Sequence, residues 1–149
     1  MDIVELHSLS PAQMGELRQL MKELTSNIEV SAEMLENVVK SPNTHLFVAL
    51  DNGANIVGCA SLCVFESPTG RKASVEDVVV LSSYRGQHLG RDLMKHLIEF
   101  ARKNLVDIDL HLTSKPQRVA ANALYQSLGF EKRDTNFYRM RIRESEVMR

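Results

Sequence analysis

The residues whose types and spacing are best suited to chemistry lie in one segment, from Val78 to Arg91. An apolar run that predicts a strand leads there into a turn containing glycine and then into a helical pattern. The first backbone N–H groups of a helix have no intrahelical partner, and the helix dipole adds about half a positive charge at that end. A phosphate can therefore bind across such a turn, and Arg85 and Arg91 would add cationic side chains. A tight turn with solvated arginines explains the same residues without a ligand.

The turn does not match two widespread phosphate-binding patterns. A dinucleotide-binding fingerprint has the form G-x-G-x-x-G after the first strand, and a P-loop requires G-K-[ST]. The sequence here reads Arg85-Gly86-Gln87-His88-Leu89-Gly90 and contains neither pattern. A phosphate at this segment would be bound by a different kind of loop.

Two neighbouring carboxylates, Glu76 and Asp77, precede the turn and are candidates for accepting a proton. Strict alternation along a strand places Glu76 on the face of Val78 and Val80, and Asp77 on the opposite face. A carboxylate among valines would have a raised pKa and would be a better general base, so Glu76 is the candidate base. A solvated strand end is the simpler explanation of the same residues. A β-bulge in this strand would upset the alternation and exchange the two acids.

Amphipathic periodicity predicts four helices around these residues. The first begins with an N-cap, a proline in the first turn and a reciprocal capping residue, which are Ser10, Pro11 and Gln13. The second begins at Ser31 and ends just before Pro42. The first helix extends to Leu24, and the other two cover residues 89–105 and 120–128.

Alternating runs rich in β-branched and aromatic residues predict the strands. They cover residues 3–6, 45–50, 56–65, 73–81, 107–113 and 136–142. Turns at residues 51–53 and 68–70 join the second, third and fourth of these strands into an antiparallel meander. The later strands alternate with helices. This order predicts an α/β (α+β) fold, with a mixed, mostly antiparallel central sheet of about six to seven strands flanked by about four helices.

The composition is that of a soluble globular protein, and it excludes several classes. The chain has 149 residues, of which 44% are hydrophobic and 25% charged, so disorder and collagen are excluded. A net charge of -1 gives no sign of a nucleic-acid or membrane partner. No repeat or linker divides the sequence, which predicts a single domain over residues 1–149. Asp2 and Glu5 lie where a signal peptide would be basic, so we expect a cytoplasmic protein.

Residues Arg85 to Gly90 resemble the GNAT superfamily of acetyl-CoA-dependent N-acetyltransferases, whose pyrophosphate-binding motif runs Gln/Arg-x-x-Gly-x-Gly/Ala. His88 departs from the pattern, because the family usually has glycine there. A second segment, Val119 to Phe130, is similar to the family's second motif and lies at the usual distance downstream. The resemblance extends from Ile3 to about Ile142 and implies the GNAT fold with acetyl-CoA as cosubstrate.

The resemblance also implies roles for individual residues. A backbone N–H between Val78 and Val80 would stabilise the oxyanion of the tetrahedral intermediate. Tyr125 would be the general acid that protonates the leaving thiolate, and Asn122 would hydrogen-bond the pantetheine arm. The expected catalytic residues are Glu76 and Tyr125. The implied cofactor-binding residues are Val78, Val79, Val80, Arg85, Gly86, Gln87, His88, Leu89, Gly90, Arg91, Asn122 and Tyr125. The implied reaction is direct attack of a primary amine on the thioester within a ternary complex.

The acceptor stays open at this point. Residues 75–80 and 84–90 are also similar to the glucosamine-6-phosphate N-acetyltransferase branch, which suggests an amino-sugar phosphate. The Ala-Ala-Asn-x-Leu-Tyr form of the second motif instead resembles general bacterial acetyltransferases that act on small amines or protein amines. We expect a small-molecule amine, with a non-catalytic acyl-CoA-binding or interaction module as the alternative.

Asp107, Asp109 and His111 share one face of a predicted strand and could be imagined as metal ligands, but an ordinary polar strand face explains them. We therefore expect no metal. On the last predicted strand Arg139, Arg141 and Arg143 alternate onto one face, where solvent is the simplest partner. The exposed edge of that strand would allow a homodimer.

Overall fold

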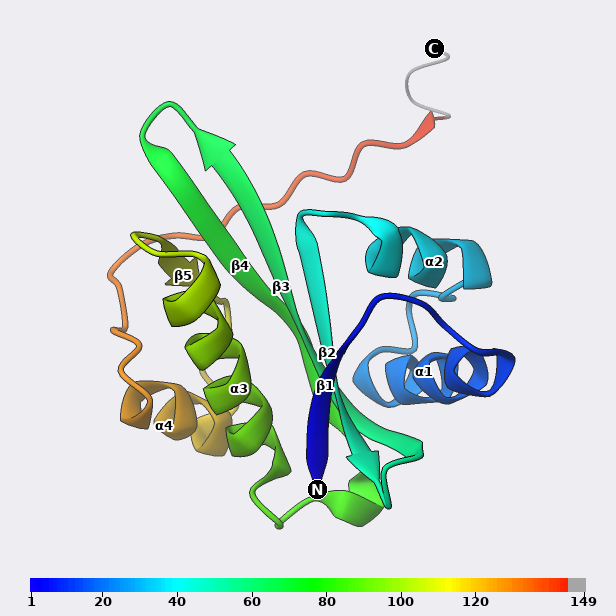
Figure 1. The fold of residues 1–149 in the computed structure, drawn as a ribbon. Helices are drawn as coiled ribbons and strands as arrows, with labels where there is room; N and C mark the ends of the chain where they lie inside the picture. Colours follow the sequence, from blue (N-terminus) through cyan, green and yellow to red (C-terminus); the bar gives the residue numbers. More distant parts are fainter. Residues whose placement is uncertain (145–149) are drawn as a thin grey trace. The chain divides into compact units, whose positions relative to one another are not determined.

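The structure is a computed structural model that describes residues 1–144 (Figure 1). The chain divides into two compact units, Met1–Lys115 and Pro116–Arg149. The first unit contains the sheet, the first three α-helices and the turn at Arg85–Gly90. The second contains one helix and the segment that follows it.

The sheet of the first unit has five strands in the order of the sequence. They are β1 (Asp2–Leu6), β2 (Thr44–Asp51), β3 (Asn55–Ser67), β4 (Gly70–Val80) and β5 (Asp109–His111). Neighbours from β1 to β4 are antiparallel, and β4 and β5 are parallel. The predicted mixed, mostly antiparallel sheet is therefore confirmed.

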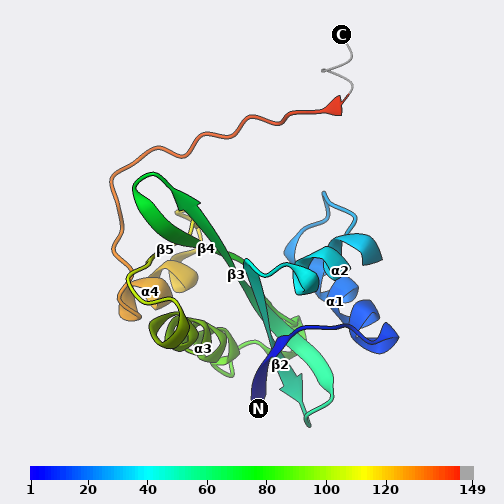
Figure 2. The ribbon, with the colours of Figure 1, turned by 45° about the horizontal axis from the view of Figure 1, so that its top comes forward.

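Helices cover both faces of this sheet. Figure 2 shows α1 (Pro11–Leu24) and α2 (Ala32–Lys40) on one face and α3 (Leu89–Asn104) on the other. Leu17 and Leu20 of α1 are fully buried in a cluster with Val48, Cys59 and Val79 of the sheet. On the opposite face Phe47 contacts rings of α3. Burying each such apolar side chain contributes about 1.5–3 kcal/mol, which fixes both layers around the sheet.

The first two helices begin as the sequence predicts. Ser10 and Gln13 form a complete capping box on α1, with hydrogen bonds of 3.1 and 2.9 Å, and Ser31 caps α2 at 3.2 Å. These side chains occupy N–H groups that the helices cannot satisfy themselves. The predicted boundaries of all four α-helices are confirmed to within about two residues.

The fifth strand is shorter than the predicted 107–113. Asp107 has a φ of 61°, in the left-handed region, so the chain does not become extended until Asp109. Only Lys72–Ser74 of β4 pairs with β5. Beyond Ser74 the two parallel strands therefore share no ladder, and the outer edge of β4 is open toward its carboxyl end.

The second unit contains α4 (Val119–Ser127), which ends at Gly129 with a φ of 103°. The predicted strand at 136–142 is wrong, because residues 130–143 have no regular secondary structure. A strand needs a neighbour that supplies backbone hydrogen bonds, and the described part of this unit contains no other strand. Arg139, Arg141 and Arg143 accordingly share no strand face, and residues 1–144 form five strands rather than six to seven.

Candidate functional site

The turn between β4 and α3 has an unusual backbone. A short 3-10 helix, η1 (Ser82–Tyr84), follows β4, and Gly86 and His88 then take φ values of 81° and 63°. Glycine reaches this left-handed region without steric cost, whereas a residue with a side chain reaches it at a cost of about 1 kcal/mol. His88 therefore adopts a left-handed conformation that favours glycine. The side chain at this position does not prevent the left-handed course of the turn.

The N-terminus of α3 is open. Its N-cap is His88, and no side chain caps it, unlike α1 and α2. Leu89 is buried, so only its backbone faces the turn. A Cβ built on Gly90 or on Gly86 would meet no atom within 4 Å. An anion can therefore approach the first N–H groups of α3 closely, where the helix dipole favours negative charge.

Arg85 lies beside this turn but points to protein groups. Its Nε–H donates to the Val80 carbonyl at 3.1 Å, and its Nη2 donates to a carboxylate oxygen of Glu23 at 3.3 Å. Its role at a phosphate site stays a prediction, as do those of Gln87 and Arg91.

The backbone at the end of β4 faces the open edge of the sheet. The Leu81 N–H donates to the Val57 carbonyl of β3 at 2.9 Å. Successive N–H groups of an antiparallel strand alternate in direction, so the N–H of Val79 points to β3 and that of Val80 points away from it. Of the last two β4 residues, Val80 is the one with an N–H on the open edge. A donor fixed in this way suits an extended ligand or a developing oxyanion.

A β-bulge at Glu76 and Asp77 interrupts the regular pairing of β4 with β3. Val79 pairs with Cys59 and Glu76 pairs with Ser61, so β4 has one residue more than β3 over this stretch, and Asp77 has a φ of 52°. Cys59 and Ser61 share a face of β3. Glu76 therefore lies on the face of Val79, toward α1 and α2, and opposite to Val80.

The predicted placement of Glu76 beside Val78 and Val80 is wrong, and the bulge is the physical reason. The pKa of Asp77 is raised above its ordinary value. Desolvation is the main cause, and the nearby charge of Glu76 adds to it. Glu76 accepts a hydrogen bond from the Ser74 hydroxyl at 2.6 Å.

Asp77 is also tied to the buried thiol of Cys59, which donates to the Asp77 carbonyl oxygen at 3.4 Å. Burial raises the pKa of Cys59 to about 12, with a contribution from the charge of Asp77. This thiol stays protonated at neutral pH, so it is a structural donor rather than a nucleophile. The only sequence signal for the bulge is the type of residue, because Asp tolerates positive φ better than Val does.

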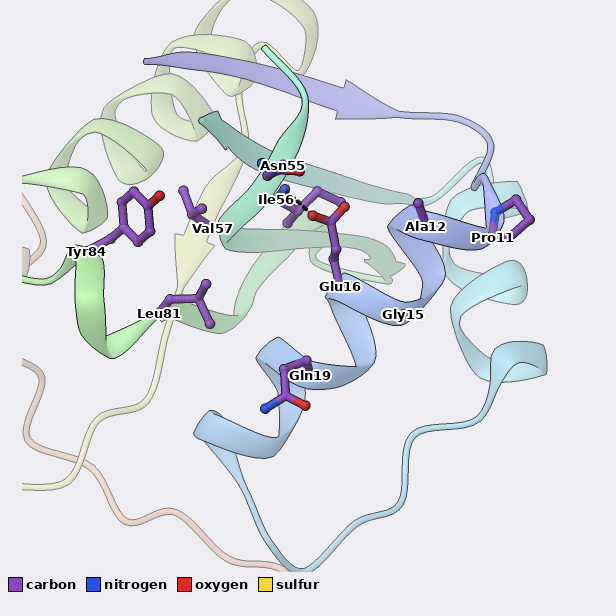
Figure 3. A pocket seen from close by; sticks show the side chains of 10 residues that line it. All are labelled: Pro11, Ala12, Gly15, Glu16, Gln19, Asn55, Ile56, Val57, Leu81 and Tyr84. Atoms are coloured by element: carbon purple, nitrogen blue, oxygen red, sulfur yellow. Dashed lines mark hydrogen bonds between the residues drawn. The ribbon is translucent and has the colours of Figure 1, made fainter. Parts of the chain in front are cut away.

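A hollow of about 500 Å³ lies on the α1 side of the turn, and no motif or periodicity indicated it (Figure 3). In Figure 3 the Glu16 side chain reaches across to β3, where it accepts the Ile56 N–H at 3.2 Å. Apolar side chains and a few polar groups line the hollow, namely Pro11, Ala12, Gly15, Glu16, Gln19, Asn55, Ile56, Val57, Leu81 and Tyr84. Neither Glu76 nor Asp77 is among them.

The second unit contains the remaining predicted site residues. Asn122 and Tyr125 lie three residues apart on α4 and so share a side of the helix. Tyr125 is buried, and its ring meets Phe130 edge to face at 6.2 Å. The structure thus gathers residues 76–91 in the first unit and Asn122 and Tyr125 in the second. The roles predicted for these two stay predictions.

Within residues 1–144 no group of three or more His, Cys, Asp or Glu side chains is arranged to hold a metal ion. None of the helices in this part of the chain is long and apolar enough to cross a bilayer.

Comparison with known proteins gives concordant results. The profile of the Acetyltransferase (GNAT) family matches residues 12–130. N-alpha-acetyltransferase RimI from Mycobacterium tuberculosis is 32% identical over 92 residues, which cover 62% of this chain and 55% of that protein. The chain spans about half the length of the curated relatives that it matches.

Solved structures share the fold over almost the whole chain. A putative acetyltransferase from Agrobacterium tumefaciens has a TM-score of 0.80 and 26% identity, covering 95% of this chain and 100% of that one. AAC(6')-Iy, solved with the bisubstrate analogue CoA-S-monomethyl-acetylneamine, has a TM-score of 0.73 and 20% identity, covering 95% and 98%.

Proposed function

Because the chain belongs to the GNAT family of acetyltransferases, we propose that it transfers the acetyl group of acetyl-CoA to a primary amine. The observation that carries this proposal is the open N-terminus of α3, entered through left-handed residues at Gly86 and His88. The diphosphate of acetyl-CoA would accept hydrogen bonds from the first N–H groups of the helix, with the space over Gly90 allowing close approach. The pantetheine arm would then follow the open edge of β4.

In this proposal Asp77 is the first candidate for the base, ahead of Glu76. An amine is mostly protonated at neutral pH and must lose a proton before it attacks. Desolvation and the Glu76 charge raise the pKa of Asp77, so its carboxylate holds a proton more readily than an ordinary aspartate. Glu76 would support Asp77 by its charge.

The reaction then follows from the remaining groups. The amine nitrogen attacks the thioester carbon, and the N–H of Val80 stabilises the oxyanion that forms. The attack forms the C–N bond, and the nitrogen then releases its excess proton to solvent. Collapse of the intermediate restores the C=O bond and breaks the C–S bond. The thiolate of CoA receives a proton, for which the Tyr125 hydroxyl is the candidate donor. The products are an N-acetylated amine and CoA, and no metal is required for any of these steps.

A small cationic amine is the acceptor that we propose first. Glu76 lies on the face of the sheet toward α1 and α2, and its negative charge, with that of the neighbouring Asp77, favours an approaching ammonium group. An amino-sugar phosphate fits this charge less well. A protein amine is the second candidate, because the relative RimI is named an N-alpha-acetyltransferase. The cytoplasmic location and the homodimer stay predictions.

A thiol-release assay tests the proposal. Purified protein is incubated with acetyl-CoA and a panel of amino sugars, amino acids, polyamines and peptides with free α-amines. We expect amine-dependent release of CoA for one class, and loss of turnover with intact acetyl-CoA affinity in Tyr125→Phe. Binding of acetyl-CoA without acetylation of any amine would favour a non-catalytic acyl-CoA-binding module. Absence of binding would overturn the proposal.

A further inference from the structure

We propose that Glu23, in the last turn of α1, is a positioning residue for the turn that binds acetyl-CoA. The inference rests on the proposed function for the identity of the ligand, but the contacts themselves are within the first unit. A carboxylate near the C-terminus of a helix is unfavourable for that helix, because the dipole is negative there. The place of Glu23 is therefore explained by partners outside α1.

Those partners are Ser82, the first residue of η1, and Arg85, the residue that follows η1. One carboxylate oxygen of Glu23, Oε2, accepts the Ser82 backbone N–H at 2.9 Å and the Arg85 Nη2 at 3.3 Å. The other oxygen, Oε1, accepts the Ser82 hydroxyl at 3.3 Å. The Glu23 side chain is 24% exposed and that of Arg85 58%, so the ion pair alone would contribute little. The carboxylate also accepts two hydrogen bonds from Ser82, and this set of contacts on one side chain fixes its geometry.

Arg85 extends the link to β4. While its Nη2 reaches Glu23, its Nε–H donates to the carbonyl of Val80, the last residue of the strand. One carboxylate thus holds Ser82 directly and Val80 through Arg85. We call this set, Glu23, Val80, Ser82 and Arg85, the turn clasp. It fixes the chain immediately before Gly86, where the left-handed course of the turn begins.

The turn clasp assigns Arg85 a different role from the one that the motif suggested. A guanidinium that bridges a carbonyl and a carboxylate orients the loop, and its charge is partly neutralised by Glu23. The phosphates of acetyl-CoA would then be bound by backbone N–H groups of the turn, with Arg85 acting through the loop. Removing Glu23 and removing Arg85 should therefore weaken the same step.

Glu23→Ala tests the turn clasp, with Glu16→Ala as the matched control. Both residues lie on α1 and accept a backbone N–H of another element, but Glu16 contacts Ile56 of β3 instead of the turn. In the ligand-free protein we expect hydrogen exchange of residues 82–90 to accelerate about tenfold in Glu23→Ala and to stay unchanged in Glu16→Ala. Unchanged exchange in Glu23→Ala would overturn the inference.

Binding and kinetics give the second readout. Glu23→Ala should raise the Kd and KM for acetyl-CoA about tenfold, while kcat at saturating acetyl-CoA stays within about twofold. Glu23→Gln keeps an oxygen for Ser82 but lacks the charge that holds Arg85, so its effect should be intermediate. If Glu23→Ala does not fold, Glu23→Gln decides the question. Hydrogen exchange and a Kd in Glu23→Gln equal to those of the unmodified chain would contradict the turn clasp.

A double-mutant cycle separates the turn clasp from direct phosphate binding. If Arg85 acts through the clasp, Glu23→Ala, Arg85→Ala and the double variant should weaken acetyl-CoA binding by similar factors. Two results would together show that Arg85 binds phosphate itself and would overturn the inference. Arg85→Ala would weaken binding much more than Glu23→Ala does, and in the double variant the two losses would add. If the unmodified chain does not bind acetyl-CoA, the proposed function and the role of Glu23 in cofactor binding are both refuted. The hydrogen-exchange experiment would still decide whether Glu23 orders the turn.

Discussion

The N-termini of α1 and α3 present the same unsatisfied backbone groups and treat them in opposite ways. On α1, Ser10 and Gln13 exchange hydrogen bonds with the backbone, and Pro11 lacks an N–H altogether. On α3, His88 is left-handed and offers no side-chain cap. Where the chain supplies its own acceptors the helix end is structural, and where it does not the end is available to an anion.

An absent cap is not sufficient by itself. The N-cap of α4, Arg118, also makes no side-chain hydrogen bond. What distinguishes α3 is the approach to it: two left-handed residues at Gly86 and His88, and open space over Gly90. The comparison with α1 therefore supports the whole turn as the proposed binding element, and substitutions at equivalent positions of the two helices can test this directly.

The largest effect is expected from a negative charge placed at the open end. Gly90 and Ala12 are both the second residue of their helix. Gly90→Asp should weaken acetyl-CoA binding by at least about 100-fold through repulsion of the diphosphate, while Ala12→Asp should change it less than about twofold. Calorimetric titration measures both. An acidic side chain in the first turn interacts favourably with the positive end of the helix dipole, so neither variant should lose thermal stability. Similar affinities for the two variants would break the comparison.

A separate loss of chemistry is expected at the β4 bulge. Asp77→Asn should lower kcat by about 100-fold, because a general base contributes on that order or more, and Glu76→Gln should lower it by less than about tenfold. Both variants should keep the acetyl-CoA affinity of the unmodified chain, in contrast to Gly90→Asp. Steady-state kinetics with the acceptor found by screening, together with direct titration, check this. The reverse ranking of the two acids would restore Glu76 as the base.

The pH dependence follows from the same two carboxylates. The folded-state pKa of Asp77 is raised, so its base form is lost, and activity falls, as the pH drops through that raised value. Glu76→Gln removes the neighbouring charge and should shift this acidic limb to lower pH.

The linked effect on stability has the opposite sign. Because the folded state binds the proton of Asp77 more tightly than the unfolded state, stability increases as the pH falls through the raised pKa. Asp77→Asn should reduce this increase. A pH profile of kcat/KM for the first effect, and urea unfolding at several pH values for the second, would show these shifts. If Glu76→Gln leaves the acidic limb of the kcat/KM profile unmoved, the assignment of that limb to Asp77 is contradicted.

The smallest effects should have opposite signs at the two N-caps. His88→Gly removes the cost of a left-handed side chain and should raise the free energy of unfolding by about 0.5–1 kcal/mol. Ser10→Ala removes a cap and should lower it by about 1 kcal/mol. Urea unfolding measures both, and acetyl-CoA affinity should stay within about threefold in each. A loss of stability in His88→Gly would show that the imidazole itself supports the turn.

Local signals predicted most of the fold. The capping residues Ser10 and Ser31, and the apolar stripes of the helices, act within a few residues of the chain, so sequence periodicity sufficed to place α1 to α4. The bulge at Asp77 could only be left open as an alternative, because a run of valines such as Val78 to Val80 fits a regular strand equally well. The predicted strand at 136–142 failed for a related reason: alternation indicates that a segment can pair, but the pairing depends on a neighbour.

The site was only partly predictable. The motif located the turn at Gly86 to Gly90, because its glycines and helix start are contiguous in sequence. The link from Glu23 to Ser82 and Arg85 joins residues 59 and 62 positions apart, and nothing in the local sequence specifies it. The choice between Glu76 and Asp77 likewise depends on the pairing of β3 with β4.

The central claim is that the open end of α3 binds the diphosphate of acetyl-CoA. Titration of the ¹⁵N-labelled chain with acetyl-CoA, followed by the amide resonances, tests it most directly. We predict saturable shifts for Gly86 to Arg91, and unmoved resonances for Ala12 and Gln13 at the capped end of α1. No saturable complex, or a complex that leaves the amides of the α3 turn unchanged, would contradict the account.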